Sequence, residues 1–202
     1  KLPHLCFHLD CSPHPPYLSI LSEARKVAGL AHPHIVALYE AHAWNETFFL
    51  VYQFIPGESL SQHSNARTWS YKRIAEVIAQ IADAAEYAHS QGIIHRDIKP
   101  SNILIDQQGH VWLTDFGLAV DKSGLPEKAG FAGTPAYMPP EIENGTVAPN
   151  ALSDVYSLGV VLYELLTQKS TRMGRGNIEY HQKERHSSRS RRLLKSRIPR
   201  DL

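Results

Sequence analysis

The feature that most constrains the fold is a long amphipathic stretch at residues 71–90, followed by two short apolar runs. Five apolar side chains recur there at intervals of three and four residues, the spacing of one helix face: Ile74, Ile78, Ile81, Ala85 and Ala88. Gly92 supplies a helix stop. The runs 103–105 and 110–113 flank the turn-forming sequence Asp-Gln-Gln-Gly and predict a β-hairpin. A helix, an irregular loop and a hairpin therefore follow one another.

The residues before this helix predict a smaller, strand-rich part. Residues 17–30 carry apolar side chains at helical intervals and predict a helix. Residues 35–41 and 47–54 are short β-rich runs and predict an antiparallel pair, with its turn at 44–46. Residues 1–16 include four prolines and predict a strand end followed by a loop.

The C-terminal half predicts one more helix, and the composition of the chain excludes several classes of protein. Residues 153–166 are apolar nearly all round and predict a buried helix. The chain of 202 residues is 43% hydrophobic and 20% charged, which excludes a disordered or collagen-like protein. Its longest apolar run falls short of the roughly 20 residues that a membrane span needs. We expect a strand-rich part and a helical part joined near residues 53–57, with a ligand in the cleft between them.

The two cysteines predict a reducing compartment, because Cys6 and Cys11 are too few for a disulfide framework. We therefore expect a cytoplasmic protein. With His8 and His14 they have spacings loosely suggestive of zinc, but this is no strong ligand pattern and a solvated loop is favoured.

The net charge of +1 conceals an asymmetry. Residues 172–202 carry ten Lys or Arg and three acidic residues, a net of +7, whereas residues 1–171 carry a net of −6. A basic end of this kind is compatible with nucleic-acid binding, but it lacks regular aromatic interleaving. We favour a divergent continuation of the preceding domain.

The loop between the predicted helix and hairpin carries polar groups suited to phosphate chemistry. In residues 95–102 (HRDIKPSN), the Asp97 carboxylate is followed by the Lys99 amine and the Asn102 carboxamide. Asp115 follows the hairpin, so its carboxylate is expected at the hairpin mouth. Oxygen ligands from Asn102 and Asp115 suit Mg²⁺, which takes few protein ligands together with substrate phosphates. Asp97 is then free to orient a nucleophile.

Four segments, in this order and over about residues 17–168, resemble the catalytic domain of protein kinases, specifically the eukaryotic-like Ser/Thr kinases of bacteria. They are HRDIKPSN at 95–102, Asp-Phe-Gly at 115–117, GTPAYMPPE at 133–141 and SDVYSLG at 153–159. The resemblance implies an α+β, two-lobed fold with a small β-rich N-lobe and a larger, mainly helical C-lobe. It divides the chain into a partial N-lobe at 1–54, a C-lobe at 55–171 and a basic C-lobe end at 172–202.

The resemblance implies a role for each polar residue of the loop. Asp97 would accept or orient the substrate hydroxyl, and Lys99 would neutralise charge on the transferred phosphoryl group. Asn102 and Asp115 would hold Mg²⁺. Thr134 is expected to contact Asp97 and Lys99 rather than to carry phosphate. Together these roles imply transfer of the ATP γ-phosphoryl group.

The nucleotide site implied by the resemblance draws on both parts of the chain. Glu23 is similar to the glutamate of the family's αC helix, and Lys1, the only lysine upstream, is assigned as its partner on the ATP phosphates. Four residues are expected around adenine: Tyr52 as gatekeeper, Gln53 and Phe54 through backbone groups, and Leu104 beneath the ring.

Two further expectations concern control. Four apolar or aromatic side chains are expected to stack into the family's regulatory spine, where ordinary core packing would look the same: Val27, Leu38, His95 and Phe116. Ser123 is the only hydroxyl residue between Gly117 and Gly133, so it is the candidate for autophosphorylation.

The substrate class follows from Lys99 and Thr134, which resemble Ser/Thr rather than tyrosine kinases. Small-molecule phosphotransferases share the loop pattern but are not expected to have the 133–141 segment. No Gly-rich phosphate loop precedes Lys1, and the last helices of the family are missing, so we expect a domain cut at both ends. The missing phosphate loop also keeps open a non-catalytic, kinase-like interaction module.

Overall fold

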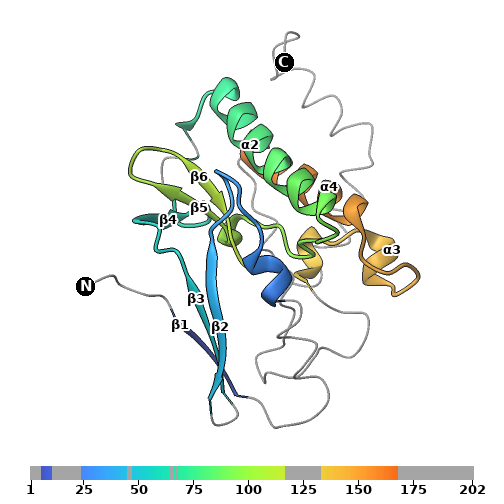
Figure 1. The fold of residues 1–202 in the computed structure, drawn as a ribbon. Helices are drawn as coiled ribbons and strands as arrows, with labels where there is room; N and C mark the ends of the chain where they lie inside the picture. Colours follow the sequence, from blue (N-terminus) through green and yellow to red (C-terminus); the bar gives the residue numbers. More distant parts are fainter. Residues whose placement is uncertain are drawn as a thin grey trace.

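A computed structural model describes residues 6–10, 24–44, 47–63, 66, 68–116 and 133–167. Within them a three-stranded sheet stands at one end of the molecule and two long helices lie at the other, with a second small sheet between (Figure 1). This arrangement confirms the predicted α+β fold with a strand-rich part and a helical part. None of the helices in the described ranges has the length and hydropathy of a membrane span.

The first sheet has the order β1-β3-β2, with all neighbours antiparallel. Its strands are β1 (Cys6–Asp10), β2 (Leu38–Trp44) and β3 (Thr47–Tyr52). The predicted pairing of the second and third strands is confirmed. However, β2 starts three residues later than predicted, because Ile35 forms an isolated bridge with Leu113 instead. Trp44, expected in the turn, pairs with Thr47 at the end of the ladder.

Strand β1 corrects the prediction that residues near the N-terminus become a loop after a strand end. All five residues of β1 pair with β3, from Cys6 opposite Val51 to Asp10 opposite Thr47. The prolines of this region lie at positions 3, 13, 15 and 16, so every residue of β1 keeps the backbone N–H that a ladder requires. The pairing also covers an edge of β3 that would otherwise be open.

The second sheet has the order β4-β5-β6 and is antiparallel. It consists of β4 (Gly57–Ser59), β5 (Ile103–Asp106) and β6 (Val111–Leu113). The predicted hairpin is confirmed as β5 and β6, but β4 was not predicted. A Cβ atom on Gly57 would lie 2.0 Å from the carbonyl oxygen of Ile105, so only glycine lets the two backbones approach this closely.

Helix α2 (Tyr71–Ser90) has the predicted bounds. The hydroxyl of Ser70 caps its first turn by accepting a hydrogen bond from the Arg73 N–H at 3.2 Å. Beyond its end, Gly92 has a φ of 73°, a left-handed conformation that glycine adopts readily. The remaining helices are η2 (Pro100–Asn102), η3 (Pro135–Tyr137), α3 (Pro140–Glu143) and α4 (Ala151–Thr167), and residues 24–28 form a further helical segment.

Helix α4 corrects the prediction of a helix buried all round. Its inward face packs against α2 and η3, and Val160 and Val161 are buried there. On the opposite face Leu152 is 76% exposed and Val155 is 62% exposed. The apolar sequence identifies a helix but cannot specify which of its faces another element covers.

The core continues from one part of the chain into the other. Ile81 of α2, Ile103 of β5 and Leu113 of β6 are fully buried in the same cluster as Leu38 and Leu50 of the first sheet. Backbone hydrogen bonds tie the parts together as well, because Val36 N–H donates to the Leu113 carbonyl at 2.9 Å. The residues that follow β6 are therefore fixed relative to both sheets.

Candidate active site

The loop between α2 and β5 is held by a buried carboxylate on α4. Asp154, only 1% exposed, accepts hydrogen bonds from the backbone N–H groups of His95 and Arg96, each at 2.8 Å. His89, at the end of α2, contacts the same carboxylate at 2.7 Å through Nε2. Two helices and the loop thus converge on one side chain, in a region where every polar group must be satisfied.

This carboxylate stabilises a strained backbone. Arg96 has a φ of 69°, in the left-handed region that disfavours residues other than glycine. Its N–H is fixed by Asp154, and the next residue is fixed by His95, whose Nδ1 accepts the Asp97 N–H at 3.2 Å. His95 Nε2 therefore carries the hydrogen and donates to the Thr114 carbonyl at 2.9 Å. Burial lowers the pKa of His95, which favours this neutral form.

Asp97 lies at the centre of a compact polar network. Its Oδ2 forms an ion pair with Lys99 Nζ at 2.5 Å. Its Oδ1 accepts a hydrogen bond from the Thr134 hydroxyl at 2.8 Å, and Lys99 Nζ donates to that hydroxyl oxygen at 2.8 Å. The predicted contact of Thr134 with Asp97 and Lys99 is confirmed, and it joins the loop to the 133–141 segment.

Asn102 is the fourth residue of this network. Its Nδ2 donates to the backbone carbonyl of Asp97 at 2.9 Å and to Asp97 Oδ2 at 3.1 Å. Both hydrogens of the amide are used in this way, and Oδ1 accepts a long hydrogen bond from the Ser101 hydroxyl at 3.4 Å. The Asn102 carbonyl also accepts the Thr114 N–H at 3.0 Å, which fixes the residue immediately before Asp115.

Asp115 follows β6 with a φ of 62°, the second non-glycine residue of the described part in the left-handed region. Surrounding protein atoms desolvate its carboxyl group and raise its pKa, although the residue remains open to solvent on one side. The charge of Asp97 raises the pKa further, whereas the Lys99 ammonium lowers it. Desolvation and the nearby Asp97 carboxylate both make the ionised form of Asp115 unfavourable. A cation bound between the two carboxylates would offset this effect.

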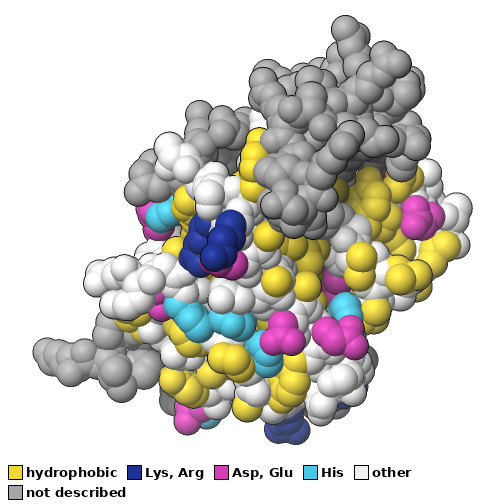
Figure 2. All heavy atoms as spheres, turned by 90° about the horizontal axis from the view of Figure 1, so that it is seen from above, with side chains coloured by type: hydrophobic (Ala, Val, Ile, Leu, Met, Phe, Trp, Pro, Cys, Tyr) yellow, Lys and Arg dark blue, Asp and Glu magenta, His cyan; other side chains and the backbone are white. Residues whose placement is uncertain are grey.

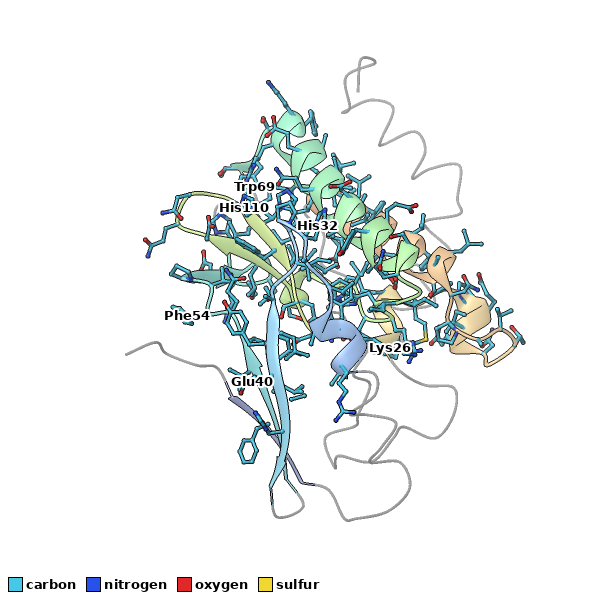
Figure 3. All side chains as sticks on the ribbon, viewed as in Figure 1. Lys26, His32, Glu40, Phe54, Trp69 and His110 are labelled. Carbon is cyan, nitrogen blue, oxygen red and sulfur yellow. The ribbon has the colours of Figure 1, made fainter. Side chains whose placement is uncertain are left out.

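The residues predicted to contact adenine lie around the connection between the strand-rich part and the helical part. Tyr52 is buried at the end of β3, and both burial and the Asp115 carboxylate raise the pKa of its hydroxyl. The Gln53 N–H donates to the Ala37 carbonyl at 2.8 Å, so only the carbonyl of Gln53 remains for a ligand. Phe54 is 44% exposed and lies where the chain passes from β3 to β4 (Figure 3). Leu104, on β5, packs against the core while staying partly exposed.

The predicted spine residues are all buried. Val27 is 4% exposed and Leu38 is 3% exposed. His95 and Phe116 are each 1% exposed, and their ring centroids lie 4.6 Å apart. These values agree with a regulatory spine and equally with ordinary core packing.

Several predicted residues lie outside the described part of the structure. They are Lys1, Glu23, Ser123, and the side chains of Cys6, His8, Cys11 and His14, together with residues 172–202. Among the described side chains, no group of three or more histidines, cysteines or carboxylates is placed to hold a metal ion.

Asp154 is the main site residue that sequence reasoning missed. Its segment, SDVYSLG, predicts a helix, but the partners of the carboxylate lie 58 and 59 residues away along the chain. A sequence signal did exist, because an acidic side chain within an apolar helix must find a buried partner.

A pocket lies directly beside Asp97 on the side of Thr134. Its lining comes from the loop after α2, from the 134–149 stretch and from α4: Arg96, Asp97, Thr134, Tyr137, Met138, Pro139, Ile142, Pro149, Ser153 and Ser157. The pocket therefore offers apolar contacts within reach of the Asp97 carboxylate.

Comparison with known proteins agrees with this geometry. A family model described as "Protein kinase domain" matches residues 13–200. The chain is 42% identical over 151 residues to the probable serine/threonine-protein kinase pknA2 of Bifidobacterium longum, covering 73% of this chain and 20% of that protein. It is 36% identical over 148 residues to the serine/threonine-protein kinase PrkC of Bacillus subtilis, covering 72% of this chain and 23% of that protein.

The similarity also extends beyond bacteria. Protein kinase 3 of Dictyostelium discoideum is 36% identical over 162 residues, which cover 74% of this chain and 18% of that protein. The chain thus spans about a fifth of the length of the curated relatives it matches. Because the family model covers most of the chain and the site geometry agrees with it, the chain belongs to the protein kinase family.

Proposed function

We propose that this protein transfers the γ-phosphoryl group of ATP to Ser or Thr hydroxyls of protein substrates. The observation that carries the proposal is the network in which Asp97 contacts Lys99, Thr134 and Asn102 at 2.5 to 3.1 Å. Phosphoryl transfer depends mainly on positioning and charge stabilisation, which such a network supplies. The network also supports an enzyme over a non-catalytic interaction module.

Asp97 is proposed to orient the acceptor hydroxyl and take its proton. The hydroxyl oxygen forms a bond to the γ-phosphorus while the bond to the bridging oxygen of ADP breaks, so the electron pair leaves with ADP. Lys99, which lies beside Asp97, is proposed to neutralise charge on the transferred group. Thr134 holds both side chains in register through its hydroxyl.

The donor set fits a hard cation. Asn102 offers Oδ1, which accepts a long hydrogen bond from the Ser101 hydroxyl at 3.4 Å, and Asp115 offers a partly desolvated carboxylate. Mg²⁺ would be held by these two residues and would supply positive charge that offsets the charge of the phosphates. The strained backbone at Asp115 supports the same assignment, because such conformations concentrate at functional sites.

The nucleotide base is proposed to lie between the two parts of the chain. The carbonyl of Gln53 and the backbone of Phe54 are proposed to contact the adenine edge, with Leu104 on one face of the ring and Tyr52 closing the back of the site. Lys1 and Glu23 are proposed as the ion pair that holds the α- and β-phosphates.

The substrate class rests on the Lys99–Thr134 contact and on the Asp97 carboxylate, toward which the hydroxyl of a peptide segment would be directed. The Ser/Thr kinase names of the bacterial relatives support the same class. The proposed partners are protein substrates and ATP, and nucleic acid is not expected among them. The proposed location is the cytoplasm or the cytoplasmic face of a membrane.

The test is transfer of label from [γ-³²P]ATP to a mixed protein acceptor by the complete natural protein, followed by phosphoamino-acid analysis. Label on serine and threonine, dependent on Mg²⁺, is expected. Label on tyrosine would contradict the substrate class. Nucleotide-independent capture of a partner without any transfer would support the interaction module instead.

A further inference from the structure

Five rings form a continuous row on the surface where the 31–36 loop meets α2 and the β5–β6 hairpin. Ring centroids are separated by 5.2 Å for Tyr87–His32, 5.8 Å for His32–His34, 4.4 Å for His34–His110 and 4.7 Å for His110–Trp112. We call this row the histidine ladder. Histidine side chains gather in a row on this face (Figure 2), and His32 and His110 lie between α2 and the hairpin (Figure 3).

The hydrogen bonds of the ladder define the position of each imidazole hydrogen. His32 Nδ1 accepts the His34 N–H at 3.2 Å, so Nε2 carries the hydrogen toward Asp83 at 3.1 Å. His34 Nδ1 contacts the Val111 carbonyl at 2.9 Å and must donate, because a carbonyl only accepts.

The third imidazole completes the pattern. His110 Nε2 contacts the Pro33 carbonyl at 2.9 Å and therefore also donates. His34 and His110 each use one nitrogen as a donor to a carbonyl, whereas His32 uses Nδ1 as an acceptor, so the His32 contact requires a ring without a hydrogen on that nitrogen. The same junction includes the hydrogen bond from Leu113 N–H to the His34 carbonyl at 2.7 Å. The ladder thus fastens the 31–36 loop to β6.

We propose that the histidine ladder is a proton-sensitive joint, closed when its imidazoles are neutral and opened by mild acid. A protonated imidazole donates from both nitrogens and accepts from neither, so charging His32 removes the acceptor of the His34 N–H. Charging both His34 and His110 would stack two cations at a centroid distance of 4.4 Å. Histidine is the side chain whose ordinary titration falls in this pH range.

The carboxylates on the neighbouring elements lie near the two ends of the ladder, so repulsion between charged imidazoles would be strongest at its middle. On α2, Asp83 faces His32, and the Tyr87 hydroxyl accepts the Ala31 N–H at 3.3 Å. On the hairpin, desolvation raises the pKa of the Asp106 carboxyl, but hydrogen bonds from the His110 backbone N–H and the Trp112 indole lower it overall.

The two carboxylates offset charge at the ends of the row. Arg73 of α2 donates to the Gly109 carbonyl and adds a positive charge next to His110. His34, in the centre, has His32 and His110 on its two sides. Charge therefore accumulates between the loop and the hairpin, where β6 leads toward Asp115.

The test is amide hydrogen exchange of the 202-residue chain at about pH 7.5 and about pH 5.5, on either side of the ordinary histidine pKa, corrected for intrinsic rates. Protection of the Val36 and Leu113 amides should fall by about tenfold or more in acid, relative to the buried α2 amides of Val77 and Ile81. Unchanged relative protection in the wild-type chain would overturn the proposal.

A donor-preserving variant isolates the charge. In His34→Asn with His110→Gln, the amide nitrogens can replace Nδ1 and Nε2 as donors to the Val111 and Pro33 carbonyls without titrating. Only the His32 imidazole of the ladder remains in this variant, so acid should reduce its protection less than in the wild-type chain. The same acid-induced loss in the variant would contradict the proposal. His42→Gln, at an exposed histidine paired with Glu40, should retain the wild-type response.

A second measurement keeps the proposal testable if the double variant does not fold. Nitrogen-15 correlation spectra of the wild-type side chains at about pH 7.5 should show His34 with its hydrogen on Nδ1 and His32 and His110 with theirs on Nε2. The opposite tautomer at His34 or His110 would overturn the proposal. Both readouts are structural, so they are independent of the proposed kinase activity.

Discussion

The carboxylate of Asp154 accepts a hydrogen bond from the backbone N–H of Arg96 at 2.8 Å, although 58 residues separate them in the sequence. This bond holds Arg96 in its left-handed conformation and so sets the direction of the next residue, Asp97. The network around Asp97 is therefore supported by α4 as well as by its own loop.

Asp154→Asn should destabilise the protein strongly. The amide keeps one accepting oxygen, so one of the two backbone N–H groups would face an amide donor instead of an acceptor, and His89 would lose its charged partner. Breaking a buried pair of this kind costs about 3 kcal/mol or more. Urea unfolding measures the change, with Glu86→Gln on the exposed face of α2 as the control. Equal stability of the two variants would show that the carboxylate does not hold the loop.

Substitutions at Arg96 should reveal the backbone strain. Arg96→Ala and Arg96→Gly both remove the side chain, but only glycine adopts a φ of 69° without a steric penalty. We expect the glycine variant to be more stable than the alanine variant by about 1 kcal/mol. Thermal unfolding of the pair checks this, and a more stable alanine variant would mean that the loop relaxes to another conformation.

Thr134→Val should reduce phosphoryl transfer by roughly 10²-fold, because it removes the hydroxyl that links Asp97 to Lys99. Thr134→Ser keeps the hydroxyl and should retain most of the rate. Steady-state kinetics with a protein acceptor distinguish the two. If valine and serine variants are equally active, the hydroxyl has no positioning role.

Asp115→Asn should have opposite effects on two properties: it should stabilise the metal-free protein and weaken metal binding. Because desolvation by the surrounding protein atoms raises the pKa of Asp115, ionisation costs the folded protein free energy at neutral pH, and this cost disappears as the carboxyl is protonated in acid. Without metal, the neutral variant should be more stable than wild type near pH 7, and the difference should shrink as the pH falls. Thermal unfolding across pH measures it.

The same two proteins should also differ in how much Mg²⁺ and ATP stabilise them. Mg²⁺ with ATP should raise the melting temperature of the wild-type protein more than that of Asp115→Asn, because the variant lacks the anionic oxygen ligand. An equal shift in both proteins would remove Asp115 from the proposed metal site.

Local patterns in the sequence predicted the local features of this structure. The α2 helix and the β5–β6 hairpin were predictable because their apolar spacing and turn residues act over a few positions. The contact of Thr134 with Asp97 followed from the family resemblance. By contrast, β4 depends on the close approach of Gly57 to Ile105, and the role of Asp154 depends on a distant loop. The exposed face of α4 depends on packing that apolar composition does not encode.

The central claim is that Asp97 directs phosphoryl transfer, and single-turnover transfer by Asp97→Asn tests it most directly. We expect the rate to fall by about 10²-fold or more while Mg²⁺-dependent ATP binding is retained, because the residue acts on the acceptor hydroxyl rather than on the nucleotide. An unchanged transfer rate in the complete natural protein would contradict the account.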